Sequence, residues 1–212
     1  IQYFILFVLG AVLAGAAELP YGGWIQIPIL SVIWLQLTLV NDASKKHSFL
    51  SGPIFGLGYF VIGLWWLYIS LHDVGGMNVA LSCMAVFLLS AYMALYYSLA
   101  TLTLSLLHKS RLTGLFLAAS WVLMEFLRGY IFTGFPWMGF AETQFNGPFA
   151  PIAPFFGGLA CTFLAVWASW EIYQLRKHAL SSILLIAIAI TTAQLGGLFT
   201  FTKPTGEPIS VR

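Results

Sequence analysis

The chain has 212 residues, of which 60% are hydrophobic and only 8% are charged, and its formal net charge is +2. Its mean hydropathy is +0.91, whereas a soluble domain carries about 25% charged residues. These values exclude a water-soluble fold and indicate an all-α protein that crosses a membrane several times. No basic patch points to nucleic acid, and no motif for a cofactor or a metal is present.

Seven apolar stretches approach or exceed the length of a membrane-spanning helix, which is about 20 residues. They cover residues 1–17, 23–40, 52–71, 78–107, 112–131, 154–175 and 179–198. Gly10 and Gly15 in the first stretch favour a helix of the protein over a cleaved signal peptide. The fourth stretch is too long for one perpendicular crossing, so we expect it to tilt or to project beyond the lipid. Residues 1–198 are therefore predicted to form a bundle of about seven membrane-spanning helices.

The positive residues predict how this bundle is oriented. Six of the nine Lys and Arg residues lie in the second, fourth and sixth connections, as Lys45, Lys46, Lys109, Arg111, Arg176 and Lys177. These three connections share one side of the membrane, and connections rich in Lys and Arg normally face the cytoplasm. The N-terminus is therefore predicted to lie in the cytoplasm and the C-terminus outside.

The tail, residues 199–212, differs in composition from the rest of the chain. It contains Pro204, Gly206 and Pro208, and residues 209–212 then alternate apolar and polar side chains, as at the start of a β-strand. We expect the tail to be a linker on the outer face that leads to a folded domain.

The fifth predicted span ends in a polar segment, which begins with Glu125 and Arg128. Residues three apart lie on the same face of a helix, so the two side chains are close enough to pair. A lone charge in the middle of a membrane costs about 2.5–3.5 kcal/mol. Two interpretations follow: an ion pair that holds the helix packing, or an Arg128 near the outer surface that binds an anionic group such as a lipid phosphate.

Residues 133–137 (TGFPW) and Gln144 continue the polar segment. Pro136 ends the helix, Gly134 permits a bend, and Phe135 and Trp137 suit the membrane interface. The segment is interpreted either as an aromatic anchor or as the lining of a portal through which a lipid leaves the bilayer. The candidate portal residues are Glu125, Arg128, Gly134, Phe135, Pro136, Trp137 and Gln144.

Other polar residues give weaker signals. His72 and Asp73 are adjacent, but a solvated loop is favoured over acid–base chemistry. Cys83 and Cys161 lie in apolar runs and are predicted to be buried thiols, with no disulfide or metal. The sequence contains no GxSxG, HExxH or Walker motif, so no catalytic set is identified.

The polar segment resembles the signature of bacterial apolipoprotein N-acyltransferase. Residues 125–130 (EFLRGY) and 133–137 (TGFPW) carry this likeness, together with Gln144, the Gly-Pro pair at 147–148 and Gly157. Residues 63–77 are similar to the third span and loop of that family. Tyr130 departs from the pattern, since the family often has Trp at this position. The likeness extends over nearly the whole chain.

The resemblance implies an enzyme of the bacterial inner membrane that completes lipoprotein maturation. Such an enzyme transfers an acyl chain from a phospholipid, typically phosphatidylethanolamine, to the amino group of a diacylglyceryl-cysteine on an apolipoprotein. Its catalytic Glu, Lys and Cys belong to a nitrilase-like domain after the linker. Neither Cys83 nor Cys161 matches that nucleophile, so this chain alone is expected to be inactive. It would anchor the catalytic domain and contribute the lipid-access cavity.

Three alternatives are left open by the residues. A secondary transporter would show an internal repeat and mid-membrane ionisable groups, and only Glu125 is deep in a span. A seven-helix receptor is opposed by the predicted orientation. A non-catalytic membrane scaffold agrees with every pattern described above.

Overall fold

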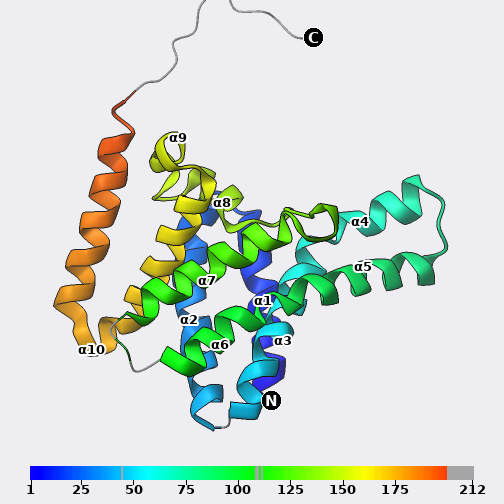
Figure 1. Cartoon of the computed structure of the whole chain (residues 1–212). Coiled ribbons are helices and arrows are strands. Elements are labelled where there is room, and N and C mark those ends of the chain that lie inside the picture. The colour runs from blue at the N-terminus through cyan, green and yellow to red at the C-terminus, as the bar shows by residue number, and fades with distance from the viewer. Residues whose placement is uncertain (44, 108–109, 111, 200–212) are drawn as a thin grey trace, which may run out of the picture.

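The computed structural model describes residues 1–43, 45–107, 110 and 112–199, and every regular element in these ranges is helical (Figure 1). The longer helices are α1 (Gln2–Ala17), α2 (Gly22–Ala43), α3 (Lys45–Gly63), α5 (Val79–Leu95), α6 (Ser98–Leu107), α7 (Thr113–Arg128) and α10 (Gly158–Gly196). The short elements are α4 (Trp66–Ile69), the π-helix η1 (Ser70–Val74), η2 (Ile131–Thr133), α8 (Phe140–Thr143), η3 (Gln144–Asn146), η4 (Ala150–Ile152) and α9 (Ala153–Phe156).

The third predicted span, residues 52–71, is bent in the structure. The helix bends by 49° between Phe49–Gly63 and Trp66–Val74. Its second part ends in η1, so His72 and Asp73 are helical and not in a loop. Their side chains are 3.9 Å apart, and His72 Nδ1 lies 2.7 Å from the Met77 carbonyl oxygen. The polar residues close the tip of the helix instead of forming a catalytic pair.

The fourth predicted span is interrupted as well, whereas the sixth and seventh are separated where the sequence predicts. The fourth, residues 78–107, consists of α5 and α6, which are separated at Tyr96 and Tyr97. The sixth and seventh form the two limbs of α10, which breaks at His178 (φ −137°, ψ 50°). Figure 1 shows these limbs as a V-shaped pair, with the second limb, residues 179–196, on the outer side of the bundle.

Three helical stretches are long and apolar enough to cross a membrane within the described ranges: Gly22–Val40, Val79–Leu107 and Gly158–Gly196. The bent third helix makes a fourth if its two parts count as one span. An all-helical, apolar fold is therefore confirmed, while the count of seven crossings and the orientation stay predictions.

Apart from the turn between η1 and α5, the described connections gather at two opposite ends of the bundle (Figure 1). Ser110 shares a cavity with Arg176 and Lys177 at one end. At the other end, the segment 131–153 packs against the start of α2 at Gly23 and against the end of α10 at Gly196. The N-terminus and the last turn of α10 also lie at opposite ends in Figure 1. We call the end that holds residues 131–153 the portal end and the other the basic end.

Aromatic side chains fill the core. Trp34 of α2 makes edge contacts with Trp121 of α7 at 6.0 Å and with Trp170 of α10 at 6.4 Å between ring centroids. Its indole N–H donates to Ser169 Oγ at 2.7 Å. Tyr97 lies over Trp121 at 4.9 Å. These rings hold α2, α7 and α10 around one centre. Edge-to-face contacts of this kind stabilise the fold beyond the contribution of the apolar area that they bury.

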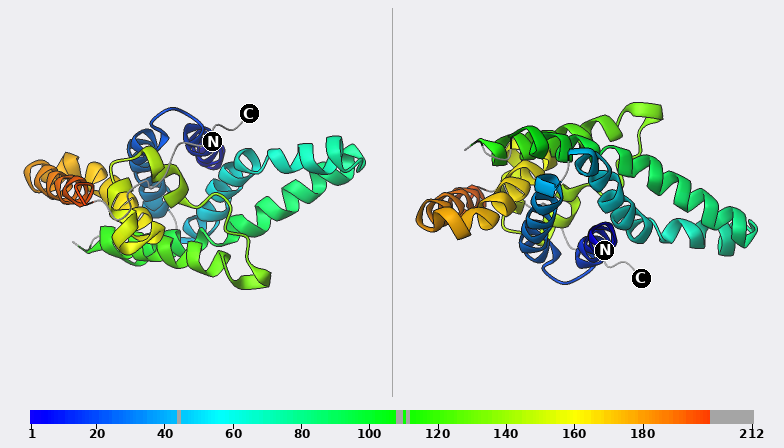
Figure 2. Two further views of the ribbon diagram at one scale, coloured as in Figure 1. Left: turned by 90° about the horizontal axis from the view of Figure 1, so that it is seen from above. Right: turned by 90° about the horizontal axis from the view of Figure 1, so that it is seen from below.

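An arm projects sideways from this core. It consists of α4, η1 and α5, and both views in Figure 2 show it extending away from the bundle. Cys83 is exposed on α5, so the prediction that both cysteines are buried is wrong for Cys83 and confirmed for Cys161. The neighbours of Cys83 along the exposed face are apolar, among them Leu81, Met84 and Phe87. A surface of this kind suits lipid, which explains why an apolar run does not imply burial here.

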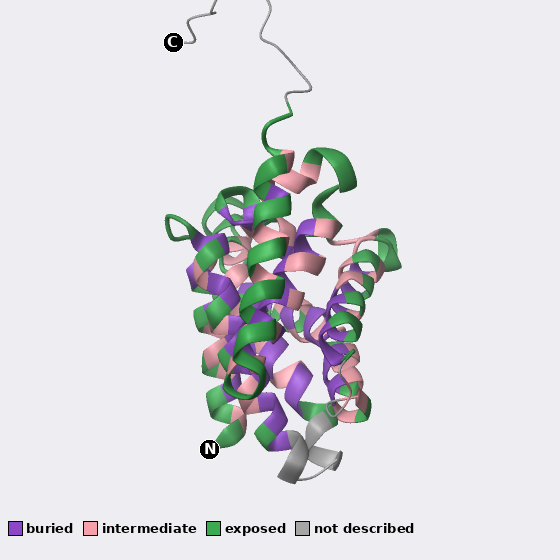
Figure 3. Ribbon diagram, turned by 90° about the vertical axis from the view of Figure 1, so that its left-hand side faces the viewer, coloured by how far each residue is buried: buried purple, intermediate pink, exposed green. Residues whose placement is uncertain are grey.

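The second limb of α10 is exposed along most of its length (Figure 3). Its exposed side chains are large and apolar, including Ile183, Leu184 and Ile188. The limb is held mainly at its ends: Ser182 donates to Glu171 Oε2 at 2.9 Å, and Gln194 Nε2 donates to the Pro148 carbonyl at 2.9 Å.

Candidate functional site

Glu125 lies one turn before the end of α7 and joins three elements. Its Oε1 accepts hydrogen bonds from Trp121 Nε1 at 3.1 Å and from the backbone N–H of Phe140 at 2.6 Å. Its Oε2 accepts from Thr162 Oγ1 of α10 at 2.8 Å. The carboxylate therefore ties α7 to the start of α8 and to α10, and these bonds occupy both of its oxygens.

Arg128 does not pair with Glu125. Within the described part of the chain, the single ion pair joins His72 to Asp73. The Arg128 side chain is buried, with 4% of its surface exposed, and its Nε–H has no hydrogen-bond partner. Its guanidinium carbon lies 5.0 Å from the centre of the Phe60 ring. Of the two interpretations of this pair, the ion pair is therefore wrong, and Arg128 is left as a buried cation with an unused donor.

The surroundings of Arg128 leave little free space. The adjoining cavity has a volume of about 10 Å³ and is lined by Phe60, Met93, Tyr96, Tyr97, Met124, Glu125 and Arg128. That is close to the minimum that one water molecule requires. An anion such as a phosphate does not fit beside the guanidinium unless a neighbouring segment moves.

The segment 131–138 folds back over the end of α7. The backbone N–H of Phe135 donates to the Arg128 carbonyl at 2.9 Å. Gly134 has φ +84°, and a Cβ atom there would lie 2.0 Å from the Gly129 carbonyl oxygen. Phe132 (φ 53°) and Thr133 (φ 72°) also have positive φ, a conformation that is uncommon outside glycine. The segment is thus tightly seated and strained.

Aromatic rings surround this segment at the surface. Phe135 stacks on Trp137 with 5.3 Å between ring centroids, and Trp137 lies 6.0 Å from Trp66 at the base of the arm. Pro136 and Trp137 are exposed, and Phe135 is half-buried. These positions agree with an aromatic group at a membrane interface.

Gln144 lies apart from this arrangement. It is buried, and its Nε2 donates to the Gly23 carbonyl at the start of α2 at 3.2 Å. Its role in the structure is therefore to hold η3 against α2. The structure brings Glu125, Arg128 and residues 134–137 to one place and connects Gln144 to a different helix.

Glu142 is a charged neighbour that the sequence reasoning left out of the candidate set. It lies on α8, outside the predicted spans, and it is one of the carboxylates that interact electrostatically with Arg128. Partial burial raises the pKa of the Glu142 carboxyl above its ordinary value, and the positive charge of Arg128 acts against this rise. Phe60 and Thr162 were also missed, since neither an apolar ring nor a single hydroxyl in a span carries a sequence signal.

The arrangement combines the fixed carboxylate of Glu125, the buried cation of Arg128 and the strained segment 131–138, which we call the aromatic cover. Neither cysteine contacts this group: the Sγ of Cys161 donates to the Phe149 carbonyl, and Cys83 is on the arm. The group contains no activated nucleophile among the residues described above.

Comparison with known proteins agrees with the sequence resemblance. The family model described as "Apolipoprotein N-acyltransferase N-terminal domain" matches residues 10–171. An apolipoprotein N-acyltransferase of Haemophilus influenzae is 36% identical over 204 residues, which is 94% of this chain and 38% of that protein. The corresponding proteins of Pasteurella multocida and Ralstonia nicotianae are each 35% identical, over 95% and 89% of this chain.

The chain spans 38% of the length of each of these curated relatives. The matched family region includes α7, the Arg128 site and the first limb of α10 up to Glu171. Both the extent of the family match and the identities establish kinship, and the chain belongs to the apolipoprotein N-acyltransferase family, of which it contains the N-terminal domain.

Proposed function

We propose that this chain is the membrane-anchoring and lipid-access part of an enzyme that acylates the amino group of a diacylglyceryl-cysteine on an apolipoprotein. A phospholipid is the proposed acyl donor, and the bacterial inner membrane is the proposed location. Family membership and the long apolar helices support this assignment. The distribution of Lys and Arg supports a cytoplasmic N-terminus, with residues 199–212 leading to the catalytic domain outside.

The observation that carries the proposal is the Nε–H of Arg128, which is buried and has no hydrogen-bond partner. An unsatisfied buried donor is unfavourable, and a guanidinium is well suited to binding a phosphate in a bidentate manner. Glu125 and Glu142 interact electrostatically with Arg128, but within the described residues neither forms an ion pair with it. Arg128 thus keeps a hydrogen-bonding donor for a ligand, and the phosphate of the acyl donor has the matching charge.

Binding requires the aromatic cover to move. The cavity of about 10 Å³ holds no phosphate, and segment 131–138 lies over the end of α7 with several residues at positive φ. Strain of this kind lowers the free energy needed to displace a segment. In the proposed sequence of events, the segment shifts, the phosphate reaches Arg128, and the exposed rings of Phe135 and Trp137 contact the acyl chains.

The test uses a full-length enzyme that contains these residues. Arg128→Gln is expected to raise the KM for the phospholipid donor by about 10- to 100-fold, the range of a charge-assisted hydrogen bond. Arg128→Lys keeps the charge and should recover part of this loss. Lys45→Gln removes one positive charge from the first residue of α3 and serves as the control.

Trp137→Ala tests the cover separately and should also raise the KM for the donor. If Arg128→Gln and Trp137→Ala both leave the donor KM and the turnover unchanged, Arg128 is structural and the lipid-access role is wrong. A chain with this result would then be a scaffold for the catalytic domain.

A further inference from the structure

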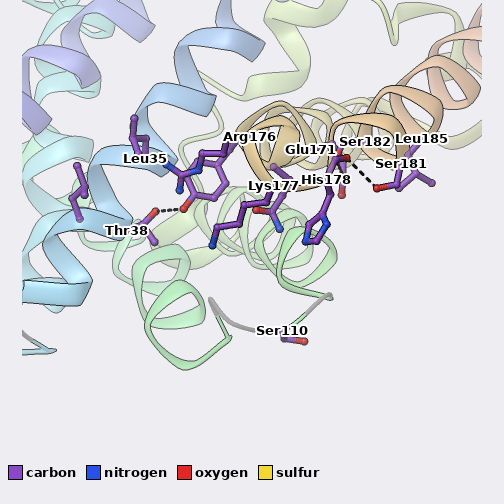
Figure 4. Close-up of a pocket in the computed structure, with 13 residues that line it drawn as sticks. Leu35, Thr38, Ser110, Glu171, Arg176, Lys177, His178, Ser181, Ser182 and Leu185 are labelled. Carbon is purple, nitrogen blue, oxygen red and sulfur yellow. Dashed lines mark hydrogen bonds between the residues drawn. The ribbon is translucent and has the colours of Figure 1, made fainter.

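A large cavity lies at the basic end, away from the portal end. Its volume is about 650 Å³, and it is formed by α2, the two limbs of α10 and Ser110 (Figure 4). Cavities of about 300–1,000 Å³ are typical of sites for small molecules. Its position at the break in α10, at His178, gives it a shape that one straight helix would not provide.

Basic side chains from one turn of α10 line this cavity: Arg176, Lys177 and His178. All three are exposed. The Arg176 guanidinium carbon lies 3.9 Å from the centre of the Tyr173 ring, which holds the side chain in place. The Tyr173 hydroxyl in turn accepts a hydrogen bond from Thr38 Oγ1 at 3.0 Å. This stacked arginine therefore has a fixed position, while its donors remain at the surface.

The acidic group in the lining is already engaged. Glu171 Oε2 accepts a hydrogen bond from Ser182 across the break in α10. Among the described lining residues, there are two permanent cations against one carboxylate, with His178 and the hydroxyls of Ser110 and Ser181 as further hydrogen-bonding groups. This lining favours a ligand with a negative charge and several acceptor oxygens.

The remaining wall is apolar. Leu35 and Leu39 come from α2, and Leu185 comes from the second limb of α10. Leu39 and Leu185 are exposed. The second limb itself is buried along only 11% of its most apolar stretch. An apolar wall next to a basic turn, in a helix long enough to cross a membrane, matches a ligand with acyl chains and not a freely soluble anion.

The geometry points to a binding site for an anionic phospholipid at the basic end, formed by Arg176, Lys177 and the leucine wall. The phosphate lies at the basic turn, and an acyl chain lies between α2 and the second limb of α10. This lipid is distinct from the acyl donor, since it occupies the opposite end of the bundle from Arg128. It lies beside the second limb, whose hydrogen bonds through Ser182 and Gln194 are to Glu171 and Pro148 and not to α2.

The experiment measures lipid binding to the purified protein in detergent by native mass spectrometry. Phosphatidylglycerol and phosphatidylethanolamine are titrated separately, and we expect tighter binding of phosphatidylglycerol. Near a membrane surface each Lys or Arg contributes about a 5-fold increase in affinity for anionic lipid, so Arg176→Gln with Lys177→Gln should lose about 30-fold. The charge-preserving pair Arg176→Lys with Lys177→Arg should retain most of the binding.

Two further measurements distinguish a lipid phosphate from a soluble phosphate ion. Leu185→Gln should weaken the binding of phosphatidylglycerol, and millimolar inorganic phosphate should not displace the lipid. Lys45→Gln with Lys46→Gln is the matched change in charge at the start of α3 and should leave binding unaltered.

Equal affinity for the two lipids, or unchanged binding in the Arg176→Gln, Lys177→Gln variant, would overturn the proposal. Displacement by inorganic phosphate together with no effect of Leu185→Gln would assign the cavity to a soluble anion and would also overturn it. The readout is binding and not acyl transfer, so its result is independent of the role proposed for Arg128.

Discussion

Arg128 and Arg176 are both arginines near the end of a helix, yet their surroundings are opposite. Arg128 is buried, has an unused Nε–H and adjoins about 10 Å³ of free space. Arg176 is exposed, stacks on Tyr173 and faces a cavity of about 650 Å³. The first site must open before it can bind a ligand, whereas the second is open already. The contrast shows that the same charge can serve a gated site and an open site in one bundle.

The closed state of the Arg128 site depends most on the three hydrogen bonds that Glu125 accepts. Glu125→Ala removes the acceptor for Trp121, Phe140 and Thr162 at once, and we expect the free energy of unfolding to fall by about 3–5 kcal/mol. Thermal unfolding in detergent, followed by tryptophan fluorescence, measures this change. Thr162→Val removes one of the three bonds and should lose about 1 kcal/mol. Equal effects of the two variants would contradict this prediction, because the bonds from Trp121 and Phe140 would then add nothing to the Thr162 bond.

A second variant disrupts the packing of residues 131–138 against the end of α7. Gly134→Ala combines positive φ with a contact of 2.0 Å to the Gly129 carbonyl, and we expect a loss of about 2–3 kcal/mol. Gly76→Ala is the matched control, because Gly76 has φ +67° with no atom within 4 Å of the added Cβ. The control should lose only about 1 kcal/mol. Similar losses in thermal unfolding would mean that the cover is not tightly seated.

The unpaired state of Arg128 predicts an unusual result for stability. Burying a charge carries a desolvation cost, which an apolar side chain of similar volume avoids. We expect Arg128→Met to leave the free energy of unfolding unchanged or to raise it by up to about 1 kcal/mol, although donor binding is lost. Arg176→Met is exposed and should change it by less than about 0.5 kcal/mol. A clear loss of stability in Arg128→Met would reveal a structural partner for its side chain.

The smallest expected effect concerns Glu142 and pH. Its pKa is raised in the folded protein, so the folded state binds more protons than the unfolded state just above the ordinary pKa of a Glu. Glu142 therefore lowers stability as pH rises through that window. Glu142→Gln should remove this trend and make the variant slightly more stable at neutral pH, by a few tenths of a kcal/mol, because the side chain is exposed. Thermal unfolding of both proteins from acidic to neutral pH tests the sign.

Much of the helical fold could be predicted because apolar stretches report directly on membrane-spanning helices. Helix α7 begins and ends within three residues of the predicted fifth span. The break at His178 also falls within the predicted connection 176–178. The bend after Gly63 was not predicted, since Leu64 and Trp65 are as apolar as a continuous helix would require. Apolar composition indicates that a segment avoids water and does not indicate whether its axis is straight.

The candidate site was predicted only in outline. The polar segment 125–137 does converge, because its residues are close in sequence and a helix end places them together. The partners of Glu125 could not be predicted, since Thr162 lies 37 residues away on another helix and the Phe140 donor is a backbone group. Gln144 was grouped with the portal by its polarity, yet its hydrogen bond is to α2. A polar residue in an apolar chain indicates a buried hydrogen bond more directly than it indicates a ligand.

The hydrogen bond between Gln194 and the Pro148 carbonyl has a consequence for the chain beyond α10. It attaches the last turns of that helix to the same connecting segment that continues from the cover of Arg128. If a shift of residues 131–138 is transmitted as far as Pro148, we expect the last turns of α10 to move with it. A fluorophore pair with one label on the cover and one at residue 199 would record that coupled movement.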